Sequence, residues 1–469
     1  MKKSWFVLFL CLPFMVQSQE ITVSEEIPIS GRRNYEIIGS LKNQTLVFTK
    51  QNFDYKIKCL DASMKLSWEK ELTFEKKQTN VLGVERLKDG FILIYSYEKN
   101  RQFIVNAHKY DIDANLRDSI TIKNFGSVYP TPGFNVVRSE DRSKLLLYYI
   151  EQQKKLHSVS FDLTNLQTLW EKSMLLTQKD VLKDWPELQI ADNGDLFLFY
   201  IKDNFRSKKK RPYYHIFHYQ GAKQFLRNWK IDLDLKLSVE VAFTIDNKNG
   251  QIIATGLYGT RTRTKAVGYF YARMPFDYKG AHILKFHEFD VAFLSDLLDE
   301  KIKKNKGSDQ ISLQESILRQ DGGILLFLEH DNRSKARKAA SRAQNLPLRG
   351  EIIKGRLQVL SIHPDGKEHW SSLLHKNQEA AADKGSLASF FLFRTAKALK
   401  LLFNDELKYN TSISEYSLKG NGSNERRSLL NTRDLDVQLE FRNAVQVNAR
   451  TLLVPSTRAR RLKLARIVY

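Results

Sequence analysis

The chain has 469 residues, a formal net charge of +22 at pH 7 and only two cysteines. Because a net positive field attracts acidic molecules, this charge favours anionic glycans, lipid headgroups or acidic proteins as partners. Only Cys59 follows the first 18 residues, so the rest of the chain cannot form an internal disulfide, which excludes a disulfide-stapled scaffold.

The first 18 residues have the pattern of a secretory signal peptide. Lys2 and Lys3 precede an apolar run from Trp5 to Val16, and residues 16–18 form a plausible cleavage site. The run is too short to span a bilayer, and no later stretch is apolar enough to do so. We therefore expect residues 1–18 to be removed and residues 19–469 to form one exported domain without a transmembrane segment. Its expected location is the periplasm, the outer membrane or the surface of a Gram-negative-type bacterium.

A unit of four short strands recurs along the chain. The stretch 186–234 is the clearest example, with Asn193-Gly194 as a tight-hairpin signal between its first two apolar runs. Most units are spaced by about 50 residues, which is typical of propeller blades. The second strand of each unit is predicted to begin near Thr45, Phe91, Lys144, Asp195, Gln251, Ile324, Leu399 and Thr451.

In chain order the units cover residues 34–74, 81–122, 133–174, 186–234, 240–289, 316–374, 388–431 and 441–469. The last unit has only three strands, and Ile21–Ile29 at the other end of the chain can supply the fourth. Such pairing removes an open sheet edge. The predicted fold is therefore all-β, a single closed β-propeller of eight four-stranded blades whose N-terminal strand closes the last blade. Seven blades is the alternative, if one weak unit is irregular.

Polar turns rich in Asp, Asn or Gly join the third and fourth strands of the units, and a tryptophan falls early in four of the fourth strands. These residues are Trp68, Trp170, Trp229 and Trp370. The pattern resembles the blades of quinoprotein-like (PQQ-type) propellers. In that family's Ala-x-Asp-x-x-Thr-Gly-x-x-x-Trp motif, only Asp162 and Thr164 before Trp170 have counterparts, one residue too close. The resemblance thus implies blade geometry and tryptophans packed between blades, and no quinone or other cofactor.

Two groups of residues have a superficial likeness to metal sites. The run 111–122 resembles a calcium loop, but Leu116 and Ile122 stand where such a loop needs Gly and Glu. His215 and His218 are three apart in a predicted strand, which places them on opposite faces. We expect a hairpin turn and structural histidines, and no metal.

Acidic residues recur in or near the first strand of each unit, which lines the channel of a propeller. They are Glu36, Glu85, Glu140, Asp192, Asp246 and Glu315. Converging carboxylates at the channel would allow glycoside hydrolysis. One acid per blade is also what any polar channel shows, so no catalytic residue is assigned.

All long insertions fall where the second strand joins the third or where one unit joins the next, so they emerge on one face of the ring. The insertions carry three basic clusters. The first is Arg206, Lys208, Lys209, Lys210 and Arg211; the second is Arg261, Arg263 and Lys265; the third is Arg333, Lys335, Arg337, Lys338 and Arg342. The units that carry them are adjacent, which favours a common anion-binding face. The alternative is a set of solvated loops without a ligand.

The sequence thus predicts a non-catalytic exported module for binding or assembly in the cell envelope. Its expected partner is an acidic envelope protein or an anionic glycan, and nucleic acid is the least expected partner. The alternative function is a carbohydrate-active enzyme that uses carboxylates at the central channel.

Overall fold

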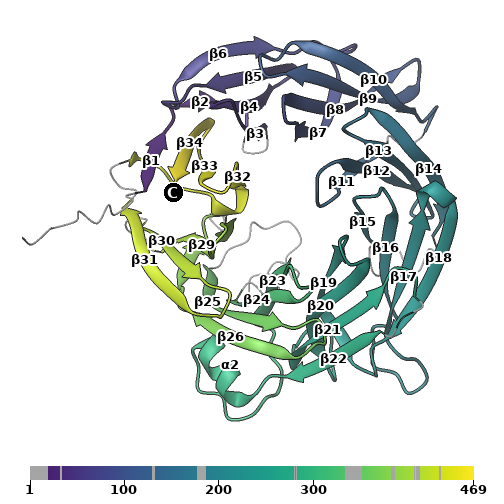
Figure 1. Ribbon diagram of the computed structural model, residues 1–469, viewed down its shortest axis with the longest axis vertical. Coiled ribbons are helices and arrows are strands. Elements are labelled where there is room, and N and C mark those ends of the chain that lie inside the picture. Colours follow the sequence, from purple (N-terminus) through teal and green to yellow (C-terminus); the bar gives the residue numbers. More distant parts are fainter. Residues whose placement is uncertain are drawn as a thin grey trace, which may run out of the picture.

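A ring of strands surrounds a central channel in the computed structural model (Figure 1). The structure describes residues 19–31, 34–128, 132–176, 186–278, 280, 282–332, 351–381, 386–405, 407, 412–431 and 435–469. The expected signal peptide, residues 1–18, lies outside the described residues, as does Trp185. None of the helices in the described ranges is long and apolar enough to cross a membrane.

Eight antiparallel sheets follow one another around the ring, with the first strand of each nearest the channel (Figure 1). Blade 1 has β3 (Tyr35–Leu41), β4 (Gln44–Gln51), β5 (Asp54–Leu60) and β6 (Leu66–Glu71). Blade 2 has β7 (Thr79–Arg86), β8 (Gly90–Lys99), β9 (Gln102–Asp111) and β10 (Leu116–Asn124). Blade 3 has β11 (Asn135–Arg138), β12 (Lys144–Glu151), β13 (Lys155–Asp162) and β14 (Gln167–Leu175). Blade 4 has β15 (Glu187–Ile190), β16 (Leu196–Lys202), β17 (Tyr213–Gln220) and β18 (Phe225–Asp232).

The second half of the ring continues this plan. Blade 5 has β19 (Leu237–Asp246), β20 (Gln251–Gly259), β21 (Gly268–Pro275) and β22 (Ile283–Glu288). Blade 6 has β23 (Ile311–Leu318), β24 (Ile324–Asp331), β25 (Glu351–Ile362) and β26 (Glu368–Leu374), with β27 (Gln378–Ala381) added beside β25. Blade 7 has β28 (Phe390–Arg394), β29 (Leu399–Asn404), β30 (Ser412–Leu418) and β31 (Asn424–Asn431). Blade 8 has β32 (Val445–Gln446), β33 (Thr451–Arg458) and β34 (Arg461–Val468).

The eight-blade prediction is confirmed, and the seven-blade alternative is wrong. The observed second strands begin within one residue of the predicted starts. Sequence could place them because central strands are buried on both faces, as β8 is from Gly90 to Tyr97, and so read as continuous apolar runs. Their side chains pack against the next blade: Phe199 of β16 stacks on Phe243 of β19, with ring centroids 4.1 Å apart.

The N-terminal segment closes the ring by pairing with the last strand, as predicted. In β1 (Glu20–Val23), Glu20 pairs with Val468 and Val23 with Ala465; in β2 (Ile27–Pro28), Ile27 pairs with Leu462. The segment is not one continuous strand, because residues 24–26 leave the register. Ser24 compensates, since its amide donates to Leu464 O (2.9 Å) and its hydroxyl accepts from Leu464 N (2.9 Å).

The four tryptophans pack between blades, as predicted. The Trp170 indole of blade 3 donates to Gly194 O of blade 4 (2.8 Å), and Trp370 of blade 6 donates to Gly420 O of blade 7 (2.9 Å). Trp229 of blade 4 donates to Met274 Sδ of blade 5 (3.0 Å), and Trp68 packs in the core shared by blades 1 and 2. The Trp170 indole also packs against Gly221, in the turn between β17 and β18. A Cβ at position 221 would lie 1.9 Å from Trp170 Cδ1, so this position needs glycine.

The expected hairpin and structural histidines are also confirmed. Asp111 Oδ1 accepts from the amides of Asp113 (3.0 Å) and Asn115 (2.8 Å), which closes the turn between β9 and β10. His218 is buried against Asp195 (3.0 Å), whereas His215 hydrogen-bonds Asn228 (3.1 Å) on the opposite face of the sheet. Within the described residues, no group of three or more His, Cys, Asp and Glu side chains could hold a metal ion.

Closure of the ring gives a first test. Deletion of residues 19–30 should leave the outer edge of β34 unpaired and uncover Leu462 and Leu464, which are now buried. We expect a lower melting temperature and concentration-dependent aggregation, measured by thermal denaturation and size-exclusion chromatography. A monomeric deletion variant with the melting temperature of the parent would contradict the closing role of β1 and β2.

Candidate functional site

The two faces of the ring differ in the length of their connections. One face, here called the loop face, carries residues 203–212 between β16 and β17, 260–267 between β20 and β21, and 289–310 between β22 and β23. The other, the turn face, carries short connections such as 191–195 and 319–323. In an antiparallel meander alternate connections emerge at opposite ends, so the loop face follows from the strand order. It also carries α2 (Val291–Leu298), whose N-terminus is capped by Asp290 accepting from Phe293 N (2.7 Å).

The first basic cluster lies on the loop face of blade 4. Asn204 fixes the start of this loop, because its side chain exchanges hydrogen bonds with the backbone of Ser238 (both 2.9 Å). Lys210 pairs with Asp203 (3.2 Å) and Arg211 lies 3.7 Å from Asp232. The remaining members, Arg206, Lys208 and Lys209, are exposed and make no ion pair with a described residue.

The second basic cluster lies on the loop face of the neighbouring blade 5, with Arg261, Arg263 and Lys265 all exposed. The third cluster, Arg333, Lys335, Arg337, Lys338 and Arg342, lies outside the described residues. Of the predicted common face, the structure thus places two clusters on adjacent blades and on the same side of the ring.

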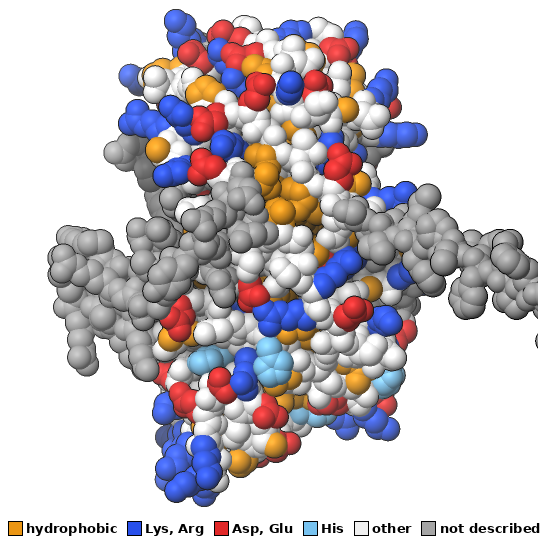
Figure 2. Space-filling model, turned by 90° about the vertical axis from the view of Figure 1, so that its left-hand side faces the viewer, with side chains coloured by type: hydrophobic (Ala, Val, Ile, Leu, Met, Phe, Trp, Pro, Cys, Tyr) orange, Lys and Arg blue, Asp and Glu red, His pale blue; other side chains and the backbone are white. Residues whose placement is uncertain are grey.

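Sequence reasoning missed a further set of cations on this face. Lys301, Lys303, Lys304 and Lys306 are exposed in the connection 289–310, and this connection pairs with the loop that carries the second cluster through a bridge between Ala266 and Ser308. Figure 2 views the side of blades 7 and 8, and a dense group of Lys and Arg side chains lies at the lower end, where Figure 1 places α2. The run of lysines was visible in the sequence, but its neighbour in the fold was not.

Two of the acids predicted near the channel meet at one arginine. Arg138 of β11 forms an ion pair with Glu85 of β7, and its guanidinium also lies 4.0 Å from Glu36 of β3. Three consecutive blades thus contribute one group each. The other predicted acids are apart from this pair: Asp246 is the last residue of β19, as expected, but it is buried and accepts from Asn249 N (3.0 Å) in a turn.

Of the remaining predicted acids, Glu140 and Asp192 lie at the turn face and Glu315 lies in β23. Glu140 accepts from Asn247 Nδ2 (3.2 Å), and Asp192 accepts from Asp141 N (3.1 Å). Burial raises the pKa of Asp192, and the neighbouring carboxylates of Asp141 and Glu140 add to the rise, so a second group of acids lies at this turn, whereas Glu315 is exposed in β23.

The Glu36–Arg138–Glu85 cluster is electrostatically unusual. Glu36 is 41% exposed to the channel, yet the surrounding walls remove much of its hydration and raise its pKa to about 7, with Glu85 adding to the rise and Arg138 opposing it. Burial likewise raises the pKa of Glu85, which is 3% exposed, against the opposing charge of Arg138. Glu36 therefore exchanges its proton near neutral pH.

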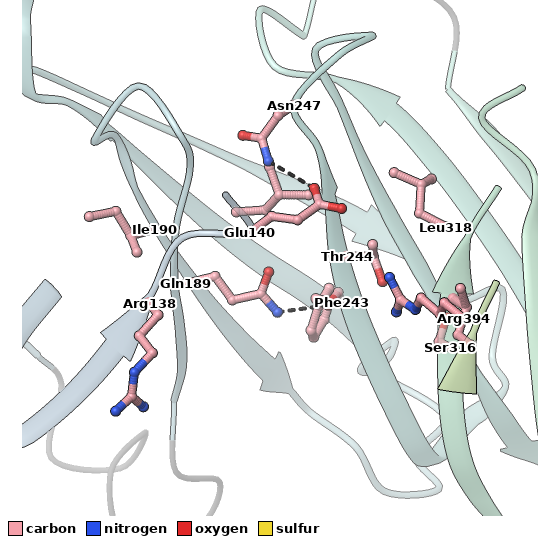
Figure 3. A pocket seen from close by; sticks show the side chains of 12 residues that line it. Arg138, Glu140, Gln189, Ile190, Phe243, Thr244, Asn247, Ser316, Leu318 and Arg394 are labelled. Atoms are coloured by element: carbon pink, nitrogen blue, oxygen red, sulfur yellow. Dashed lines mark hydrogen bonds between the residues drawn. The ribbon is translucent and has the colours of Figure 1, made fainter. Parts of the chain in front are cut away.

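Two cavities open along the channel. The cavity on the turn face has a volume of about 240 Å³ and is lined by Arg138, Glu140, Gln189, Asn247 and Arg394 among others (Figure 3). Its polar groups are tied to one another, since Glu140 accepts from Asn247 and Gln189 donates to Phe243 O (2.7 Å). The cavity on the loop face has a volume of about 800 Å³, within the range of ligand pockets, and reaches from Glu240 and Glu315 to Thr264.

Comparisons with known proteins assign this chain to no family. No protein-family model and no curated protein matches the sequence. The propeller of Dos1 is 8% identical over 95% of this chain and 94% of its own, with a TM-score of 0.43. Porphyromonas gingivalis dipeptidyl peptidase 4 is 10% identical over 90% of this chain and 56% of its own, with a TM-score of 0.45. The propeller domain of the Trilobed protease from Pyrococcus furiosus, described as having an open velcro topology, is 9% identical over 86% of this chain and all of its own, with a TM-score of 0.38.

At such low identities and TM-scores, none of these structures assigns an activity to this chain. The strand order of the eight sheets establishes a β-propeller. The specific likeness to quinoprotein-type propellers stays a prediction.

The Glu36 carboxyl gives a test of the channel electrostatics. Its pKa is about 7 in the folded protein against an ordinary value of 4.5, so the folded protein holds a proton in this window that the unfolded chain has lost. The free energy of unfolding should therefore fall as pH rises from 4.5 to 7, and Glu36→Gln should remove the part of this fall that Glu36 causes. Urea denaturation at several pH values measures the difference.

Glu69→Gln provides the opposite case, because hydrogen bonds from Lys56 and then Lys58 lower the pKa of Glu69. The ionised Glu69 carboxylate stabilises the fold above its ordinary pKa, and this stabilisation is lost as pH falls through the lowered pKa. Glu69→Gln should therefore alter only the acidic end of the plot of stability against pH. A slope between pH 4.5 and 7 that is the same in Glu36→Gln and the parent would refute the raised pKa.

Proposed function

We propose that the protein is an exported β-propeller that serves as a binding or assembly module of the cell envelope, and that its loop face receives an acidic partner. The proposal is carried by one observation: two basic clusters project from adjacent blades on the same face, and Arg206, Lys208, Lys209, Arg261 and Lys265 make no ion pair with a described residue. Like charges held together repel one another, and an anionic partner relieves that repulsion.

The rigid ring suits this role. The loops leave from strands whose core is closed on both sides, so their ends are fixed relative to one another while their tips remain open to a partner. An acidic envelope protein and an anionic glycan both fit the charge of this face.

The first basic cluster gives the direct test. Replacing Lys208, Lys209 and Lys210 together with serine should leave the melting temperature nearly unchanged, because exposed loop charges contribute little to folding. The variant should retain less acidic material from envelope extracts at low salt, and the difference should shrink as salt rises, since screening shortens electrostatic reach to about 8 Å at physiological ionic strength.

The matched control replaces three exposed lysines of the turn face, Lys88, Lys397 and Lys419, with serine. It removes the same charge and should bind like the parent. If both variants lose binding equally, the effect comes from net charge and not from the loop face. If the Lys208–Lys210 variant loses no binding, these loops are solvated and hold no partner.

A second candidate function, a carbohydrate-active enzyme, is favoured by the Glu36–Arg138–Glu85 cluster alone. Glycoside hydrolysis uses two carboxyl groups, one protonated and one ionised, on either side of the scissile bond. Glu36, whose pKa is about 7, can hold a proton at neutral pH, while Glu85 is ion-paired with Arg138. In this candidate Glu36 is the acid and Glu85, held by Arg138, is the second carboxyl group.

Release of reducing ends from alginate, hyaluronan, chondroitin sulfate and pectin tests this candidate. If the cluster is catalytic, Glu36→Gln and Glu85→Gln should each lower the rate by about 10²–10⁴-fold. Glu140→Gln, which removes a channel acid outside the cluster, should keep the parental rate. A parent protein that releases no reducing ends from any of the four polysaccharides would eliminate the candidate for this substrate class.

A further inference from the structure

The loop 260–267 and the connection 289–310 form one surface, although more than thirty residues separate their basic runs in the sequence. Ala266 N donates to Ser308 O (2.8 Å) and Ser308 N donates to Ala266 O (2.9 Å), so the two segments pair like short strands. The Asn305 side chain strengthens the junction by donating to Val267 O and Phe289 O (both 2.9 Å). Gly307, at φ +76°, lies where a Cβ would come within 3.1 Å of Lys265 Cβ, so the backbone that follows the lysine run lies against Lys265.

Seven exposed cations are collected by this junction, and we name them the composite basic surface: Arg261, Arg263, Lys265, Lys301, Lys303, Lys304 and Lys306. None of its five lysines makes an ion pair with a described residue. One nearby acid, Asp299, pairs with Arg356 (2.6 Å). The five lysines are therefore concentrated without an ion-pair partner among the described residues, which is the arrangement that an external polyanion neutralises.

The side chains between these cations indicate the class of partner. Threonine hydroxyls alternate with the arginines at 260–264, and Asn305 lies within the lysine run. No aromatic residue and no exposed large hydrophobic side chain occurs in 259–267 or 299–310, the parts that carry the cations; the exposed Val291 of the connection 289–310 lies outside them, at the start of α2. Protein interfaces depend on buried aromatic and apolar anchors, and single-stranded nucleic acids are held by stacking on aromatic rings. A surface of cations, hydroxyls and amides without either feature fits a hydrophilic polymer with regularly spaced anionic groups.

We propose that the composite basic surface binds a linear polysaccharide bearing sulfate, phosphate or carboxylate groups. This inference rests on the proposed function, because it uses the same face of the propeller, and it narrows the partner from any acidic envelope component to an anionic glycan. It also adds Lys301–Lys306 to the residues that bind.

Binding of a labelled heparin oligosaccharide, measured by fluorescence anisotropy with the full mature chain, tests the inference. Replacing Lys301, Lys303, Lys304 and Lys306 with serine should weaken binding by about tenfold or more at 50 mM salt. The difference from the parent should diminish toward about 200 mM, because binding by the variant releases fewer counterions and therefore depends less on salt. Glutamine at the same four positions is the second variant, for use if the serine variant is poorly folded. Dextran sulfate should compete with the probe, and neutral dextran should not.

Two controls separate the geometry from the charge. Serine at Lys42, Lys88, Lys397 and Lys419 removes four exposed lysines from the turn face and should leave the affinity within about twofold, the change expected of exposed substitutions away from a site. Asn305→Ala keeps every cation but removes the side-chain hydrogen bond to Val267 O, one of the contacts that hold the connection to blade 5, and it should weaken heparin binding by less than the quadruple variant does.

The outcomes distinguish the inference from the function on which it rests. If the Lys208–Lys210 variant loses envelope material while the Lys301–Lys306 variant binds heparin like the parent, the composite surface is not the glycan site and the proposed function stands. If the parent retains no acidic envelope material at low salt, the proposed function fails as well. Duplex DNA bound as tightly as the heparin oligosaccharide, with the same dependence on the four lysines, would overturn the assignment to polysaccharides.

Discussion

The structure depends on the burial of both faces of each blade against its neighbours. A four-stranded sheet such as blade 2 presents apolar side chains on both faces of its central strands. If the sheet stood alone, these apolar faces would be exposed to water. Stacking in a ring solves this for every blade at once. The Phe199–Phe243 stack and the indole of Trp229 on Met274 are two contacts of the interface between blades 4 and 5. Each blade consequently fixes the position of the next.

A ring of this kind has one weak point, where the two ends of the chain meet. Blade 8 has only three strands from the C-terminal part, and β1 and β2 complete it from the other end of the sequence. Ile27 and Ile29 then enter a core that contains Leu462 and Leu464 of blade 8 and Val47 of blade 1. The closing strands β1 and β2 therefore connect the last blade to the first, and the arrangement of the loop face depends on this connection.

Charge is distributed differently inside and outside the ring. In blade 6 the buried Lys354 and Lys376 are matched by carboxylates, with Lys376 2.7 Å from Glu329 and Lys354 2.7 Å from Asp331. A buried ion without a partner is costly, so pairing there is required for folding. On the loop face the lysines stay hydrated, so they do not bear the cost of desolvation and can lie close together without acidic partners. The contrast explains why exposed lysines can gather on the loop face while the buried lysines of blade 6 require carboxylate partners.

The sequence alone determined the blade count, the strand positions and the closing strand, because alternating burial and turn chemistry are local properties that recur with each blade. It also identified the tryptophans as inter-blade contacts, since each occupies the same place in its blade. The junction of Lys265 with Gly307 and the meeting of Glu36 and Glu85 at Arg138 came only from the tertiary structure. Both join residues of different connections or blades, and their proximity depends on how the loops fold back and how side chains reach across the channel. No periodicity in the chain encodes those distances.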